Sequence, residues 1–165
     1  MNFLFRPVIR YSSTKEAKDK NFDECRTLDK SSFVKSFVYG SQACSFDRQH
    51  FMEFIGILAD VAGVPSQDYT IEHDPSGFYA HIPSGVIDFL YKTGSDLVLP
   101  FEPLITCRYP HKIISNKFCK ALESDFKNHL SKAKSIFKTS EIKQYGQMHA
   151  VVCEAIINNG FLYVS

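Results

Sequence analysis

The chain has no tryptophan, no apolar run long enough to cross a bilayer and almost no net charge. A membrane-spanning helix needs about 20 mostly apolar residues in a row, so the sequence predicts no such helix. With 19 Lys and Arg against 18 Asp and Glu, the net charge of +1 gives no overall attraction to nucleic acid or membrane. The motifs GxxxxGK(S/T), GxGxxG, HExxH and GxSxG are also absent, which removes the sequence support for the enzymes that depend on them.

Disulfide motifs are missing as well, although the chain contains five cysteines. Their number is odd and no two form a CxxC pair, so the pattern does not resemble a secreted disulfide framework. Free thiols are typical of a reducing compartment. We therefore expect a soluble intracellular protein, with the cytoplasm favoured. The cysteines are Cys25, Cys44, Cys107, Cys119 and Cys153.

Phenylalanine and tyrosine are abundant, with 15 Phe and 8 Tyr among 165 residues. Each of these side chains can bury a large apolar area. A chain of this length commonly folds as one domain and buries roughly two-thirds of the surface that it exposes when unfolded. The composition therefore predicts a single domain spanning residues 1–165.

Residues 1–24 allow two interpretations. The segment is basic and contains no acid before Glu16, which resembles a mitochondrial presequence and makes the mitochondrion the alternative location. Apolar residues also alternate with Arg6 and Arg10, which predicts a first β-strand followed by an arm. Pro7 would then place this strand at the edge of a sheet. The alternating residues, expected on one face, are Phe3, Phe5, Ile9 and Tyr11.

Hydrophobic periodicity predicts an α+β domain. Apolar residues recur at helical spacing over residues 46–62, 115–137 and 140–158, which predicts one helix before and two helices after a central region. In that region, residues 67–109, short apolar segments alternate with turn signals and predict an antiparallel β-meander of about four to five strands. The three helices should pack on this meander. The expected strands cover residues 69–73, 78–82, 86–92, 97–101 and 104–109, and a closing strand is expected at 161–164.

Two ends of the first helix have recognisable signals. Ser45 or Asp47 can cap its start with a side-chain oxygen. Gly63 followed by Pro65 is typical of a helix end, because glycine adopts the left-handed conformation there and proline cannot continue the helix. The helix should therefore end close to residue 62.

One catalytic hypothesis joins Cys44, His149 and Asn158. Cys44 precedes the predicted helix at 46–62, and a thiol at a helix N-terminus has a lowered pKa. The order Cys, His, Asn and the sequence His-Ala-Val at residue 149 resemble papain-like thiol hydrolases. That resemblance implies Cys44 as nucleophile, His149 as base and Asn158 or Asn159 as its orienting partner. The segment around His149 favours a helix, whereas those enzymes carry the base on a strand.

Metal binding has less support in the sequence. If residues 74–77 form a hairpin loop, His73 pairs with Phe78 and His81 pairs with Thr70, so the two imidazoles point to opposite faces. Cys107, His111 and Cys119 have spacings that match no standard zinc motif. The sequence therefore predicts neither a metal site nor a cofactor.

Lysines are concentrated in the C-terminal part of the chain. Residues 112–143 contain eight lysines and three acids, a local excess of five positive charges. Lysines on one helix face can contact phosphates, which makes nucleic-acid association an alternative function. The same stretch contains no arginine, the residue most used to read bases. The candidate contacts are Lys117, Lys120, Lys127 and Lys134.

A short stretch resembles the plasmid antirestriction proteins. Residues Tyr69-Thr70-Ile71-Glu72-His73 and Gly77-Phe78-Tyr79 follow an apolar helix, as the corresponding hairpin does in that family. The resemblance implies a non-enzymatic inhibitor of a DNA-restriction system. It also implies an order of helix, meander and C-terminal helices.

Because no set of residues supports catalysis strongly, the sequence favours a non-enzymatic binding or accessory protein that acts through protein–protein contacts. An exposed sheet face, a sheet edge or the lysine-rich helix could hold the partner. Aromatic residues are common anchors of such interfaces. The expected tyrosine contacts are Tyr79, Tyr91 and Tyr109.

Overall fold

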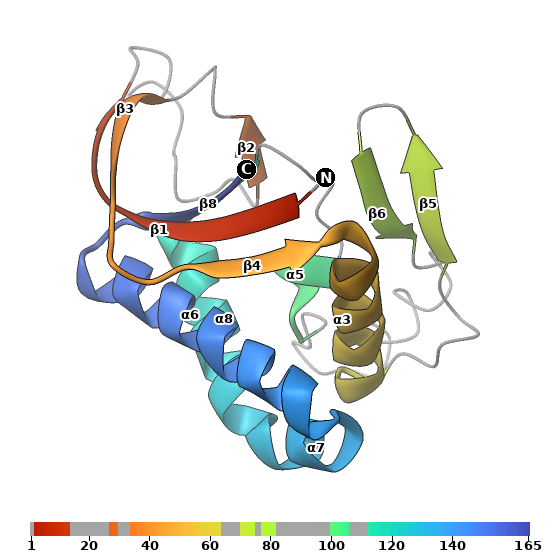
Figure 1. The fold of residues 1–165 in the computed structure, drawn as a ribbon. Coiled ribbons are helices and arrows are strands. Elements are labelled where there is room, and N and C mark those ends of the chain that lie inside the picture. The colour runs from red at the N-terminus through yellow and green to blue at the C-terminus, as the bar shows by residue number, and fades with distance from the viewer. Residues whose placement is uncertain are drawn as a thin grey trace, which may run out of the picture.

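The computed structural model describes residues 2–13, 27–29, 34–63, 70–74, 77–81, 100–105 and 112–165. Its main element is an antiparallel six-stranded sheet with helices packed against one face (Figure 1). The strand order is β2-β7-β8-β1-β3, and β4 also pairs with β1. The α+β class is therefore confirmed. The strands are β1 (Asn2–Ser13), β2 (Thr27–Asp29), β3 (Val34–Tyr39), β4 (Cys44–Asp47), β7 (Lys112–Ile114) and β8 (Phe161–Val164).

The first strand is present as expected, but it does not lie at an edge. On one side β1 pairs with β8, and on the other side it pairs first with β4 and then with β3. Pro7 fits there because its carbonyl points to Gly40, whose N–H donates to it at 2.8 Å. The missing N–H of Pro7 therefore faces the break between β3 and β4, where the ladder is interrupted.

A bulge in β1 changes which face its side chains occupy. The register shifts between Val8 and Arg10, which makes Ile9 the extra residue. Phe3 and Phe5 point into the core under the helices, but Tyr11 lies on the opposite face, with its ring 4.8 Å from that of Phe161. The expectation that Tyr11 shares a face with Phe3 and Phe5 is therefore wrong.

The face of the sheet away from the helices carries a smaller aromatic cluster. Tyr39 stacks on Tyr163, and the Arg6 guanidinium lies 3.6 Å from the centre of the Tyr39 ring. A cation over an aromatic face is attracted by the negative charge of the ring surface. The buried members are Val8, Ile113, Phe161 and Tyr163, with Phe37 and Tyr39 partly buried.

The predicted helices are present with one break. They are α3 (Arg48–Val61), α5 (Glu102–Ile105), α6 (Asn116–Asn128), α7 (Leu130–Ile136) and α8 (Thr139–Ile157). Asp47 caps α3 by accepting from the His50 N–H at 2.9 Å, and Gly63 follows α3 with a φ of 88°, as its C-cap signal indicates. The single helix expected over 115–137 is two helices, because the backbone leaves helical geometry at His129.

The predicted meander is only partly present in the described residues. The hairpin forms as β5 (Thr70–Asp74) and β6 (Gly77–His81) and is a separate two-stranded sheet. Residues 100–105, expected to contribute to strands, contain a turn and the short helix α5. The expected strand at 86–92 lies outside the described residues. The larger sheet is built instead from segments before and after the predicted meander, which pair over long sequence separations.

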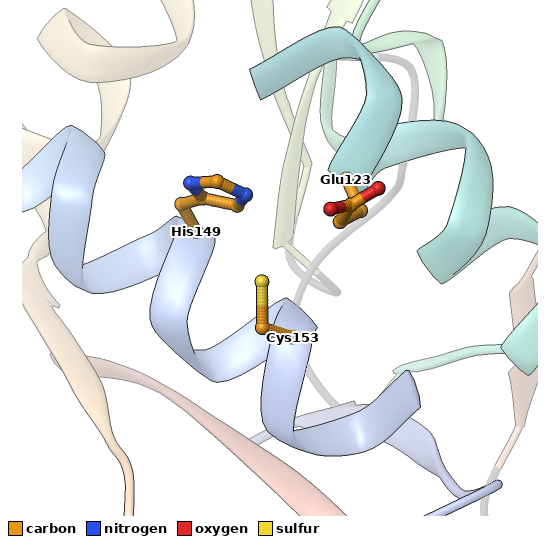
Figure 2. A group of neighbouring side chains, drawn as sticks. All are labelled: Glu123, His149 and Cys153. Atoms are coloured by element: carbon orange, nitrogen blue, oxygen red, sulfur yellow. The ribbon is translucent and has the colours of Figure 1, made fainter. Parts of the chain in front are cut away.

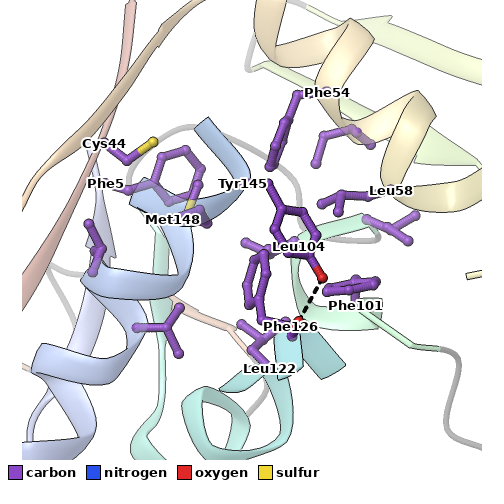
Figure 3. Close-up of a cluster of buried hydrophobic side chains, with 14 of the residues drawn as sticks. Phe5, Cys44, Phe54, Leu58, Phe101, Leu104, Leu122, Phe126, Tyr145 and Met148 are labelled. Carbon is purple, nitrogen blue, oxygen red and sulfur yellow. Dashed lines mark hydrogen bonds between the residues drawn. The ribbon is translucent and has the colours of Figure 1, made fainter. Parts of the chain in front are cut away.

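The main core lies between the sheet and helices α3, α6 and α8 (Figure 3). Tyr145 of α8 is 1% exposed and packs with Phe101, Phe126 and Phe137. Its hydroxyl donates to the Phe126 carbonyl at 2.9 Å, which satisfies the buried oxygen. Among the described residues, none of the helices has the length and apolar character that crossing a membrane requires.

Candidate functional site

An open groove lies between α3, α7 and the start of α8. Its volume is about 370 Å³. Ligand sites in proteins commonly measure roughly 300–1,000 Å³, so the groove can receive one or two anchoring side chains. Its lining residues are Glu53, Gly56, Ile57, Asp60, Ile136, Lys138 and Glu141.

Helix α3 supplies one wall of the groove because its groove residues recur at helical spacing. Residues 53, 56, 57 and 60 are three or four positions apart and share one face of the helix. The opposite face of α3 carries Phe54 and Leu58 into the core. Ile136 contributes an apolar surface from α7 and is 39% exposed. Covering this aliphatic side chain would be favourable, because burial of apolar surface lowers the free energy.

Carboxylates dominate the charge of the groove. Three of its lining residues are acidic, namely Glu53, Asp60 and Glu141, and one, Lys138, is basic. Burial raises the pKa of the Asp60 carboxyl, and Lys132 acts in the opposite direction. Glu141 also accepts from the Lys138 N–H at 2.9 Å and so caps α8. The groove therefore combines two isoleucines with an excess of acidic side chains.

The structure gives Cys44 no access to solvent. Its side chain is 1% exposed, and its Sγ lies 4.0 Å from the Gln144 carbonyl oxygen. Burial raises the pKa of the thiol to about 12, opposite to the lowering expected at a helix N-terminus. Cys44 in fact lies in β4, and α3 begins only at Arg48. These properties give the hydrolase hypothesis no support.

The other members of the proposed catalytic set have their own contacts. Asn158 follows α8, and its side chain donates to the Glu154 carbonyl at 2.8 Å. His149 lies on α8, as the helical interpretation expected, and stacks on Phe126 with the ring centres 5.5 Å apart.

His149 has two neighbours that sequence reasoning did not select. Figure 2 shows Glu123 of α6 pointing toward His149 and Cys153 of α8. One potential ligand atom from each residue lies within 4.8 Å of the other two. The spacing of His149 and Cys153 could have been noticed, because residues four apart share a helix face. Glu123 could not have been selected without knowing that α6 packs against α8.

The candidate lysines are all exposed on α6 and α7. Lys127 forms an ion pair with Glu123, one helical turn earlier. Lys134 lies beyond the break at His129, so the four lysines do not share one continuous helix. Association with nucleic acid stays a prediction. The set comprises Lys117, Lys120, Lys127 and Lys134.

The remaining candidates lie mostly outside the described side chains. The backbone of Tyr79 lies in β6, while Tyr91, Tyr109, Cys107 and His111 lie outside the described residues. The register of β5 and β6 pairs His73 with Phe78 and His81 with Thr70, as predicted. Cys119 is buried, and its thiol donates to the Ile114 carbonyl at 3.4 Å.

No protein-family model, curated protein or solved structure significantly matches this chain.

Proposed function

We propose that this chain is a non-enzymatic binding protein whose groove between α3, α7 and α8 receives an apolar and basic segment of a protein partner. The carrying observation is the combination of Ile57 and Ile136 with the carboxylates of Glu53, Asp60 and Glu141 around one cavity. An aliphatic side chain of the partner would cover the isoleucines. Lysine or arginine side chains beside it would meet the three carboxylates.

The chemistry of the groove favours this occupant over an anionic one. Complementary charge steers association and excludes partners of the wrong sign. Contacts at the rim of an interface usually contribute little affinity, whereas a buried apolar anchor contributes more. We therefore expect Ile136 to determine affinity and the carboxylates to determine selectivity and salt dependence.

A designed peptide can test the groove before the natural partner is known. The probe is a helical peptide with a leucine stripe flanked by lysines, titrated into the isotopically labelled full chain. The amide and methyl signals of Ile57 and Ile136 should shift on binding. A peptide with glutamate in place of every lysine should bind much more weakly.

Charge reversal provides the matched variants. Glu53→Lys combined with Asp60→Lys should weaken binding of the lysine peptide by at least about tenfold, because two attractive contacts become repulsive. Lysine at residue 60 lies in the last turn of α3, where a cation is favourable for the helix, so the fold should be retained. Gln147→Lys adds a positive charge on an exposed part of α8 outside the groove and should leave binding unchanged. Equal binding by the charge-reversed and wild-type chains would refute the proposal.

A further inference from the structure

We propose that Glu123, His149 and Cys153 form a binding site for Zn²⁺ between helices α6 and α8. The three side chains offer a carboxylate oxygen, an imidazole nitrogen and a thiol sulfur, which are the three ligand types that zinc uses in proteins. The site lies apart from the groove and does not depend on the proposed partner binding.

The backbone geometry supports convergence of the three groups. His149 and Cys153 are four residues apart on α8, so their side chains occupy one face of the helix. Glu123 reaches the same point from α6, and the three potential ligand atoms lie within 4.8 Å of one another (Figure 2). Around a tetrahedral zinc ion, ligand atoms at bond lengths of about 2.0–2.3 Å lie about 3.3–3.8 Å apart. Small rotations of the partly buried Glu123 and Cys153 side chains would close the difference.

An unsatisfied nitrogen gives independent evidence for a ligand. The Nε2 atom of His149 is buried and has no hydrogen-bond partner within the described structure. Such a polar atom costs free energy unless a partner completes it. The ring is fixed by stacking on Phe126 at an interplanar angle of 16°. A fixed and unsatisfied imidazole is suited to bind a metal ion.

The neighbouring charges set how the ion would bind. Burial lowers the pKa of His149, with Glu123 opposing and Lys127 assisting, so the imidazole is neutral and able to donate its lone pair at pH 7. Burial and Glu123 raise the pKa of Cys153, so its thiol is protonated until the ion arrives. Zinc binding should therefore release a proton. Lys127, paired with Glu123, is a nearby positive charge that weakens cation binding.

Three protein ligands leave one tetrahedral position for water or another donor. Structural zinc sites normally close all four positions with protein groups, whereas three-ligand sites keep an open one. The thiolate favours zinc over magnesium or calcium, which take oxygen ligands. The same ligands accept Co²⁺, which serves as a spectroscopic probe.

The test uses the full chain treated with chelator and then titrated with Co²⁺ and Zn²⁺. Wild type should develop the visible bands of tetrahedral Co²⁺ and a thiolate-to-cobalt charge-transfer band, and Zn²⁺ should displace both. Cys153→Ser should lose the charge-transfer band. Loss of an outer contact alone typically weakens metal binding about 10–100-fold, so His149→Gln and Glu123→Gln should each weaken Zn²⁺ binding at least about tenfold. Lys127→Met should strengthen it, because it removes a positive charge.

Matched controls separate this site from the other thiols and imidazoles. Cys44→Ala removes a buried core thiol, and His50→Gln removes an exposed histidine of α3; both should bind cobalt as wild type does. The double variant C25S/C107S should also keep the band. A band that persists in Cys153→Ser, a band lost in C25S/C107S, or no band in wild type would each overturn the proposal. Circular dichroism confirms that every variant is folded.

Discussion

Tyr145 and His149 make an informative comparison because they lie one turn apart on α8 and both pack on Phe126. The Tyr145 ring centre is 4.8 Å and the His149 ring centre 5.5 Å from that of Phe126. The Tyr145 hydroxyl is satisfied by the Phe126 carbonyl, whereas Nε2 of His149 has no hydrogen-bond partner in the described structure. The same helix therefore carries a buried polar group with a hydrogen-bond partner at Tyr145 and one without a partner at His149, beside Cys153.

The difference separates stabilising groups from groups available for binding. Almost all buried polar atoms in folded proteins have a hydrogen-bond partner, because leaving one unpaired destabilises the fold by more than a typical hydrogen bond stabilises it. Functional sites are the common exception, since their ligand supplies the missing partner. Glu154 on the same helix is again complete, accepting from Ser41 and Gln42 over 2.7–2.9 Å. The incomplete imidazole is therefore the group on α8 that a ligand would complete.

Removing the Phe126 ring, on which Tyr145 and His149 both pack, should have the largest effect on stability. Phe126 is 0% exposed and contacts Phe101 as well as Tyr145 and His149. Phe126→Ala should lower the free energy of unfolding by about 3–5 kcal/mol, because it creates a cavity in the core. Urea unfolding followed by circular dichroism measures the change. Phe126→Leu, which retains more volume, is the control and should cost clearly less; equal losses would show that packing of the ring is not the cause.

Removing the hydrogen-bonded hydroxyl of Tyr145 should have the second largest effect on stability. Tyr145→Phe removes only the hydroxyl and leaves the Phe126 carbonyl without its donor. We expect a loss of about 1–2 kcal/mol in the free energy of unfolding. A double-mutant cycle does not apply here, because the acceptor is a backbone carbonyl that no side-chain substitution removes. A loss near zero would mean that water replaces the hydroxyl at this position.

Removing the unsatisfied imidazole of His149 should raise stability, opposite to the effect expected at Tyr145. His149→Phe keeps an aromatic ring on Phe126 and removes the unsatisfied Nε2. In the presence of chelator, the variant should be more stable than wild type, by up to about 1 kcal/mol. The same substitution abolishes a zinc ligand, so function and stability are expected to oppose each other here. If His149→Phe lost as much stability as Tyr145→Phe, the proposed difference between the unsatisfied imidazole and the satisfied hydroxyl would be wrong.

Local sequence patterns identified most helices and both ends of α3 correctly. The Asp47 cap, the Gly63 stop and the long stripe that becomes α8 are local features, and the structure has them. The break at His129 was not predicted, because apolar spacing continues through it: Ala133 is buried beyond the break as Phe126 is before it. Periodicity alone does not register a single residue whose backbone leaves helical geometry.

Sheet topology and the cluster around His149 could not be derived in the same way. Phe5 pairs with both Cys44 and Val164, two partners that lie far away in the chain. No local pattern encodes such pairing. The convergence of Glu123 on His149 likewise follows from the packing of α6 on α8, although the helical spacing of His149 and Cys153 was visible in the sequence.

The smallest expected effect is a difference in pH dependence. Burial lowers the pKa of His149 below its usual 6.5, with Glu123 acting against and Lys127 with this shift. Below pH 6.5 the unfolded chain therefore binds more protons than the folded chain, and wild type should lose stability as the pH falls through the folded-state value. His50 acts in the opposite direction, because its hydrogen bond to Asp47 raises its pKa. Urea midpoints measured in chelator from about pH 7 to about pH 5 in a His50→Gln background should fall more steeply with His149 than with Phe at that position. Parallel curves would show that the imidazole takes up protons as readily folded as unfolded, and the contrast with Tyr145 would then rest on stability at neutral pH alone.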